Sequence, residues 1–249
     1  MKFRSSMQSR TPSPENDIFS LSIVPQRDNK AAGTTSTDFD GFLERPLLLH
    51  EDLKDGCGGQ LWPAGMTLAK YLLKYQHDLQ GKSVLEIGAG GGLVGLAIAS
   101  GCFISDDRKV IITDQIPMRS LMQKNIALNG LEERVVAEVY DWGSPMPAAI
   151  SSQLESAVET ADKHPDILVA ADCVYFEPAF PLLLRTLTDL IGASTVCYFC
   201  FKRRRKADMR FVRGMNKTFN VEEVDYEDIQ ENKRSSVFLY KLTAKKETS

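Results

Sequence analysis

Three aspartates stand directly after apolar runs that predict buried strands. They are Asp114, Asp141 and Asp172. Ligands of parallel sheets bind beyond the carboxyl ends of the strands, so we expect these side chains at one edge of the sheet. A carboxylate can chelate the two hydroxyls of a ribose, and it can also attract and orient an amine. The residues therefore indicate chemistry on a nucleoside and an amine.

A glycine-rich turn is the strongest local signal for a cofactor. It follows the predicted strand 83–87, and five of the eight residues 88–95 are glycine. Glycine lets a backbone approach a ligand without a Cβ in the way, and the start of the following helix offers free N–H groups. A purely structural tight turn would explain only one or two of these glycines, so the turn predicts a cofactor loop.

Two classes of cofactor fit this loop. Gly90, Gly92 and Gly95 match the Gly-x-Gly-x-x-Gly pattern of dinucleotide-binding proteins, and Asp114 follows at the distance expected of a ribose ligand. S-adenosylmethionine also contains a ribose, so Asp114 does not discriminate between the two. No Tyr-x-x-x-Lys pair or other evident set for hydride transfer occurs, which favours S-adenosylmethionine.

The same turn, read from Glu86, gives Glu-x-Gly-x-Gly-x-Gly. This resembles motif I of the class I S-adenosylmethionine-dependent methyltransferases, in which the residues that end the third strand contact the adenine. The resemblance implies a cofactor site formed by Trp62, Glu86, Gly88, Ala89, Gly90, Asp114, Gln115, Asp141, Trp142 and Ala171.

The segment Asp172-Cys173-Val174-Tyr175 follows the fourth strand of the series. It resembles the Asp-x-x-Tyr motif of family 16 methyltransferases, a group of eukaryotic protein-lysine enzymes, and the resemblance covers about residues 40–243. It implies that Asp172 and Tyr175 are catalytic, that Trp62 lines the methionine end of the cofactor, and that the substrate is a protein. Within the family the chain is most similar to yeast-type enzymes that modify translation elongation factor 1-alpha.

The residue types suit methyl transfer to a lysine. A lysine side chain has a pKa of about 10.4, so its amine is protonated at neutral pH and must lose a proton before it can attack. Asp172 could attract and orient the amine, and Tyr175 could hydrogen-bond it or wall its channel. Whether Asp172 or water takes the proton stays open. So do plainer roles: helix caps for Asp114 and Asp172, a core position for Trp142, and an ordinary loop position for Tyr175.

Other polar and sulfur-containing groups give weaker signals. The basic run 202–206 reads as a solvated helix start, a nuclear-localisation or nucleic-acid patch, or a docking site for an acidic protein surface. Cys197 and Cys200 lie three apart in a predicted strand, so they should face opposite sides as core residues. His50, His77 and His164 show no metal-ligand spacing, and we expect no metal.

The elements that must position these residues alternate regularly from residue 62. Apolar runs predict strands at 83–87, 110–113, 135–140, 166–171, 195–201, 221–225 and 237–242. Helical spacing predicts helices at 66–77, 93–101, 117–129, 147–161, 180–191 and 207–217. This order is typical of an α/β fold with a doubly wound, seven-stranded, mostly parallel sheet of the Rossmann-like methyltransferase type. Residues 1–16 are expected to form a disordered tail, and residues 17–61 an N-terminal β extension and linker. Within this extension we expect strands at 18–24 and 43–50, with a polar linker at 27–38 between them. Residues 62–243 are expected to form the methyltransferase domain, and residues 244–249 a second tail.

The composition argues against nucleic acid and membranes as binding partners. The net charge of −3 gives no bulk attraction to nucleic acid or anionic membranes, and the longest nearly apolar run is too short to span a bilayer. With no secretory signal recognisable, we expect a cytoplasmic monomer, with the nucleus left open. Two other functions stay open: a nicotinamide-type small-molecule N-methyltransferase, and a methyltransferase-like protein without activity.

Overall fold

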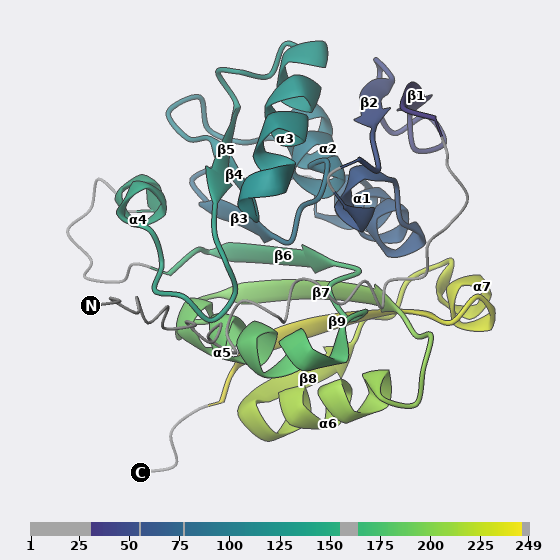
Figure 1. The fold of residues 1–249 in the computed structure, drawn as a ribbon, viewed down its shortest axis with the longest axis vertical. Helices are drawn as coiled ribbons and strands as arrows, with labels where there is room; N and C mark the ends of the chain where they lie inside the picture. The colour runs from purple at the N-terminus through teal and green to yellow at the C-terminus, as the bar shows by residue number, and fades with distance from the viewer. Residues whose placement is uncertain (1–30, 55, 77, 155–163, 246–249) are drawn as a thin grey trace, which may run out of the picture.

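The computed structural model describes residues 31–54, 56–76, 78–154 and 164–245. Its centre is a seven-stranded sheet in the order β5-β4-β3-β6-β7-β9-β8 (Figure 1). The strands are β3 (Val84–Ile87), β4 (Val110–Asp114), β5 (Val135–Val139), β6 (Ile167–Ala171), β7 (Val196–Lys202), β8 (Phe219–Glu223) and β9 (Val237–Ala244). Strands β3 to β7 pair in parallel, and β9 pairs antiparallel with both of its neighbours. The predicted doubly wound, mostly parallel sheet is therefore confirmed.

Helices cover both faces of this sheet (Figure 1). They are α1 (Pro63–Tyr75), α2 (Leu93–Gly101), α3 (Ile116–Leu128), α4 (Ala148–Leu154), α5 (Phe180–Leu190), α6 (Asp208–Thr218) and α7 (Ile229–Arg234). Side chains alternate between two cores: Ile167 and Val169 of β6 pack with α1, α2 and α3, whereas Leu168 and Ala170 pack with α4, α5 and α6. This alternation is why the strands are apolar on both faces.

The order of strands reverses between β3 and β6, because the chain first runs outward from β3 to β5 and then returns to the other side of β3. The loops that follow β3 and β6 therefore diverge at the carboxyl edge of the sheet, which is where ligands of open α/β sheets bind. The glycine turn follows β3 and Asp172 follows β6. The topology thus brings the two predicted halves of the site together.

A separate hairpin, β1 (Gly33–Thr37) and β2 (Leu47–Glu51), precedes the sheet and packs beside α3. The side chains of Asn125, on α3, and Asn129, directly after it, bond the backbone of β2 in the manner of a neighbouring strand. Asn125 accepts from the N–H of His50 (2.7 Å) and donates to its carbonyl (3.2 Å), and Asn129 does the same with Leu48 (2.8 Å each). Asn125 also donates to the carbonyl of Gly91 (2.9 Å), so one buried amide joins the hairpin to the glycine turn.

The differences from the predicted elements lie mainly outside the sheet. Residues 33–37, predicted as part of a polar linker, form β1, because β2 supplies a pairing partner that the sequence pattern does not reveal. The short polar helix α7 was not predicted, because it has no apolar period. The strand predicted at 18–24 and the end of the helix predicted at 147–161 lie outside the described residues. The domain boundaries stay a prediction.

Two smaller expectations were examined in the same residues. Cys197 and Cys200 are both fully buried and belong to opposite cores, as predicted for residues three apart on a strand. Within the described ranges, no group of three or more His, Cys, Asp or Glu side chains is placed to hold a metal ion. None of the helices there is long and apolar enough to cross a membrane.

Candidate active site

The glycine turn adopts a backbone that side chains would disturb. Gly88, Gly90 and Gly92 have φ angles of 61°, 56° and 88°, in the left-handed region that favours glycine. A Cβ on Gly88 would lie 2.8 Å from both the Cys173 sulfur and the Trp142 ring. Ala89 is buried, and its N–H bonds the carbonyl of Thr113 at 2.9 Å. The turn is therefore fixed against both neighbouring strand ends.

Glu86 lies beneath this turn. Its side chain is buried, and one carboxylate oxygen accepts the N–H of Gly95 at 2.8 Å, near the start of α2. Burial raises the pKa of Glu86 to about 8, with the charge of Asp114 adding to the rise and the N–H donors of Gly95 and Val94 opposing it. The carboxyl group therefore holds the residues that follow the turn through its bond to Gly95. Its direct contact with a cofactor stays a prediction.

Asp114 ends β4 and is joined to the turn. One carboxylate oxygen accepts the N–H of Gly90 at 2.7 Å, and the other accepts the N–H of Gln115 at 2.7 Å. The N-cap residue of α3 is Gln115, and no side chain makes a cap bond to this helix. The alternative role of Asp114 as a helix cap is therefore excluded. Burial raises the pKa of Asp114, and the charge of Asp141 raises it further. Each oxygen retains a lone pair for a ligand hydroxyl.

The residues after β5 border the same turn. Asp141 is exposed, while Trp142 is half-buried and packs at the edge of the core with its ring against Gly88. Ile116 is 71% exposed directly after Gln115. Trp142 therefore borders the glycine turn, and Ile116 is exposed where α3 begins, two residues after Asp114.

Asp172 opens the other half of the site, after β6. Its φ of 56° places a non-glycine residue in the left-handed region, which aspartate tolerates better than most residues and which is enriched at functional sites. Its backbone N–H bonds the carbonyl of Cys200 at 2.8 Å. No side chain caps the short helix Glu177–Ala179 or α5, so the alternative role of Asp172 as their cap is excluded.

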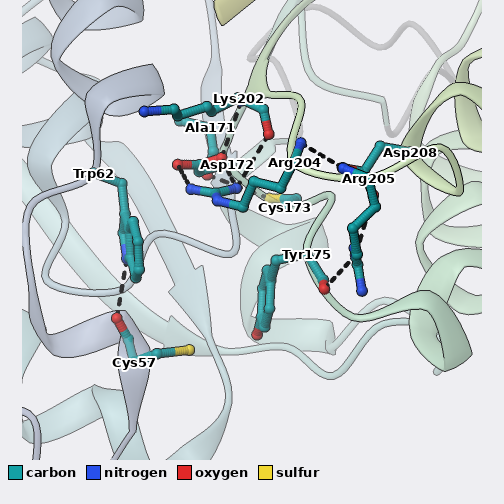
Figure 2. Close-up of polar contacts among 10 residues, drawn as sticks. All are labelled: Cys57, Trp62, Ala171, Asp172, Cys173, Tyr175, Lys202, Arg204, Arg205 and Asp208. Carbon is teal, nitrogen blue, oxygen red and sulfur yellow. Dashed lines mark hydrogen bonds and ion pairs between the residues drawn. The ribbon is translucent and has the colours of Figure 1, made fainter. Parts of the chain in front are cut away.

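The carboxylate of Asp172 meets a cation from the basic run (Figure 2). Arg204 donates to its two oxygens at 2.8 Å each, and the backbone N–H of Lys202 donates to one of them at 3.1 Å. The hydrogen bonds to Asp172 raise the pKa of Arg204. Arg204 could not be singled out from the basic run 202–206, because a run of like charges carries no signal for which side chain turns inward.

Tyr175 and two residues of the N-terminal segment complete this half (Figure 2). The Trp62 indole N–H donates to the carbonyl of Cys57 at 3.0 Å, and the guanidinium of Arg204 lies 5.1 Å from the Trp62 ring. The Tyr175 ring points toward the side of the site where Cys57 lies (Figure 2). Burial raises the pKa of Tyr175, and the charges of Cys57 and Asp114 add to it, so the phenol keeps its proton at neutral pH. Cys57 was missed, because an isolated cysteine in a Gly-rich turn carries no pattern.

Two small residues separate α1 from the end of β6. Ala171 is half-buried, and a Cβ on Gly65 of α1 would lie 4.0 Å from its methyl group. The predicted residues therefore gather at one edge of the sheet: glycines and Asp114 after β3 and β4, Trp142 after β5, Asp172 after β6, and Trp62 before α1. The arrangement can hold a nucleoside on one side and a cationic amine on the other.

The fold is that of S-adenosylmethionine-dependent methyltransferases. The chain superimposes on a Thermus thermophilus 16S rRNA N2 G1207 methyltransferase, solved with S-adenosylmethionine and guanosine, with a TM-score of 0.54 at 15% identity, over 86% of this chain and 50% of the other. A predicted O-methyltransferase from Agrobacterium tumefaciens gives a TM-score of 0.52 at 15% identity, over 74% and 82% of the two chains. At such identities the likeness describes the fold alone.

Sequence comparison narrows the class to a family. A model described as lysine methyltransferase matches residues 42–218. The Saccharomyces cerevisiae protein-lysine N-methyltransferase EFM6 is 35% identical over 90% of this chain and 96% of its own length. The zebrafish (Danio rerio) protein N-lysine methyltransferase METTL21A is 32% identical over 87% and 89%, and the mouse (Mus musculus) EEF1A lysine methyltransferase 3 is 32% identical over 67% and 66%. The chain belongs to the lysine methyltransferase family of S-adenosylmethionine-dependent protein-lysine N-methyltransferases.

Proposed function

We propose that this protein methylates a lysine of translation elongation factor 1-alpha, with Asp172 and Tyr175 receiving the amine and the glycine turn holding the cofactor. The carboxylate of Asp172, which follows β6 and is held by Arg204 and the N–H of Lys202, is the observation that carries the proposal. The substrate is supported by the similarity to the mouse EEF1A lysine methyltransferase 3 and by the resemblance to yeast-type enzymes. A translation factor also suits the cytoplasmic location and the monomeric state expected from the sequence.

The residues present fit S-adenosylmethionine. Asp114 retains a lone pair on each oxygen, which suits the two ribose hydroxyls, and Gln115 follows it at the rim. Trp142 and Asp141 border the turn on the side expected for the adenine. Gly88, Ala89 and Gly90 expose backbone without large side chains, and Glu86 holds the turn in place from below. When bound, the cofactor supplies a methyl group on a cationic sulfur.

The acceptor half has the groups that an incoming lysine needs. An ammonium ion is attracted by the Asp172 carboxylate and aligned by it, and alignment accounts for much of the rate of a displacement reaction. Tyr175 keeps its phenolic proton, so it acts as a hydrogen-bond partner or a wall and not as a base. Trp62 and Ala171 bound the region between the two halves, where an apolar surface excludes water from the reacting groups.

A methyl-transfer assay tests the proposal. The purified chain is incubated with tritiated S-adenosylmethionine and purified elongation factor 1-alpha, and the product is analysed by gel fluorography and peptide mass spectrometry. We expect one labelled lysine in the factor. The Asp172→Ala variant should lose transfer while its affinity for the cofactor stays within a few-fold of wild type. Asp189→Ala, which changes an exposed aspartate on α5, serves as the matched control.

The outcomes separate the alternatives. Label in a protein other than elongation factor 1-alpha would show that the proposed substrate is wrong and that the methyltransferase activity is right. Label only in small molecules of a cell extract would indicate a small-molecule N-methyltransferase. Binding of the cofactor without any transfer would indicate a protein without catalytic activity, and full activity of the Asp172→Ala variant would refute the role of that residue.

A further inference from the structure

Asp172 is already paired with a cation of its own chain. The guanidinium of Arg204 donates one hydrogen bond to each carboxylate oxygen at 2.8 Å, and the side chain of Asp172 is 4% exposed. One oxygen also accepts the N–H of Lys202, so only one lone pair of the carboxylate is left without a donor. A lysine of a substrate that is to contact Asp172 directly must therefore compete with Arg204.

The loop after β7 is built to hold Arg204 in this position. The carboxylate of Asp208, fully buried at the start of α6, accepts the backbone N–H of Arg204 at 2.8 Å and that of Arg205 at 2.9 Å. The Arg204 guanidinium also lies 5.1 Å from the Trp62 ring, within the range of a cation–π contact. Because a buried carboxylate fixes the backbone of Arg204, the side chain starts from a fixed position that faces Asp172.

The Asp172 side chain is 4% exposed and that of Arg204 is 28% exposed. Separating the two therefore leaves a partly buried guanidinium without its anion, and this is the costly part of such an exchange. When a substrate ammonium takes the place of the guanidinium at Asp172, Arg204 loses its anion. A surface hollow of about 400 Å³ beside it offers no replacement, because it is lined by Arg203, Arg205, Lys206, Met209 and Ser236. The side chain of Arg205 is itself paired with Asp208. A carboxylate of the substrate, brought to the open side of Arg204, would replace the anion that the guanidinium loses.

We propose that Arg204 is a specificity-determining residue that selects lysines accompanied by a carboxylate of the substrate. When the substrate binds, Asp172 exchanges its partner Arg204 for the acceptor lysine. Arg204 in turn pairs with an acidic side chain of the substrate. Charge is balanced before and after the exchange. A lysine without an acidic neighbour would leave Arg204 unpaired and would bind poorly. The inference rests on the proposed role of Asp172.

The experiment is a double-mutant cycle between enzyme and substrate. Lysines methylated by the wild-type chain are first mapped by mass spectrometry in a dialysed eukaryotic cell extract, with S-adenosylmethionine carrying a deuterated methyl group. In the most strongly labelled protein, the carboxylate residue nearest the modified lysine is changed to its amide. The kcat/KM for both substrate forms is then measured with wild type, Arg204→Ala and Arg204→Lys. Arg213→Ala, an exposed arginine on α6 outside the run, is the matched control.

The removal of the carboxylate should lower kcat/KM by about tenfold to a hundredfold with wild type, the range of a hydrogen bond between charged groups. With Arg204→Ala the loss should be under about threefold, because the coupling is absent. Arg204→Lys retains the charge and should give an intermediate loss, and Arg213→Ala should respond like wild type. Thermal unfolding of each variant checks that the fold is intact.

Two results would overturn the inference and leave the proposed function standing. One is the same loss of kcat/KM in wild type and Arg204→Ala. The other is a most strongly labelled lysine with no carboxylate within reach of a side chain. Absence of any labelled lysine with wild type would instead refute the proposed function, and the role of Arg204 with it.

Discussion

The carboxyl group of Glu86 should make the stability of this protein fall as the pH rises. Burial raises its pKa from 4.5 to about 8 in the folded chain. Between these values the folded state holds a proton that the unfolded state has released, so a rise in pH favours unfolding. The test is Glu86→Gln, which has the same shape, stays neutral at every pH, and retains a carbonyl oxygen for the N–H of Gly95.

The size of the effect follows from the width of this window. Each pH unit between the two pKa values is worth about 1.4 kcal/mol for one proton. From pH 5.5 to pH 7.5, wild type should therefore lose about 2 to 3 kcal/mol of unfolding free energy relative to Glu86→Gln. The deficit should keep growing up to about pH 8 and then level off, because the folded chain also releases the proton there. It should vanish below pH 4.5, where the unfolded chain is protonated as well.

Urea denaturation followed by far-ultraviolet circular dichroism gives the unfolding free energy of both proteins at each pH. The comparison with Glu86→Gln cancels the titration of all other groups. Glu44→Gln, at an exposed position before β2, controls for a change of net charge. A constant difference between wild type and Glu86→Gln across this pH range would refute the reasoning, because it would mean that Glu86 is ionised in the folded protein.

Three further predictions follow from the same contacts. Asp114→Ala should weaken binding of S-adenosylmethionine by about 1.5 to 3 kcal/mol in titration calorimetry, and unchanged binding would exclude it as the ribose ligand. Gly90→Ala should lower the unfolding free energy by about 1 to 3 kcal/mol more than Gly130→Ala does, because both have a positive φ but only the Cβ at Gly90 meets a carbonyl oxygen at 2.4 Å. Equal losses would show that backbone strain alone matters. Asn125→Ala should cost about 2 to 4 kcal/mol, because it leaves two backbone groups of His50 and one carbonyl of Gly91 without their partner; a loss below 0.5 kcal/mol would mean that water replaces the amide.

The sheet could be predicted because its strands obey a strong local rule. Runs such as residues 167–171 are apolar on both faces, and parallel strands covered by helices on both sides require this pattern. The order of the strands was not predicted, because apolar runs do not show which strands pair. The hairpin strand β1 escaped prediction, since its partner β2 lies across a turn and its own residues, Gly-Thr-Thr-Ser-Thr, read equally well as a linker.

The candidate site was predictable where function depends on backbone shape. The glycine turn is marked in the sequence because glycine suits a positive φ, and Gly88, Gly90 and Gly92 have one. Asp172 was marked by its place after a predicted strand and by the Asp-x-x-Tyr resemblance, and its own positive φ was not foreseen. Arg204 could not be singled out, because its inward direction depends on the buried carboxylate of Asp208. A side chain that lies four residues further along the chain, at the start of a predicted helix, gives no hint that it fixes an arginine over the site.

The asparagine that joins the hairpin to the glycine turn has a consequence for regulation. Asn125 bonds β2 and Gly91 at once, and Gly58 lies against Gly90. A protein that binds the hairpin and displaces β2 would therefore change the conformation of the turn as well. It would thereby change the affinity of the turn for the cofactor. Thermodynamic linkage makes this coupling reciprocal: filling the turn would change how tightly that protein holds the hairpin, although the two ligands never touch.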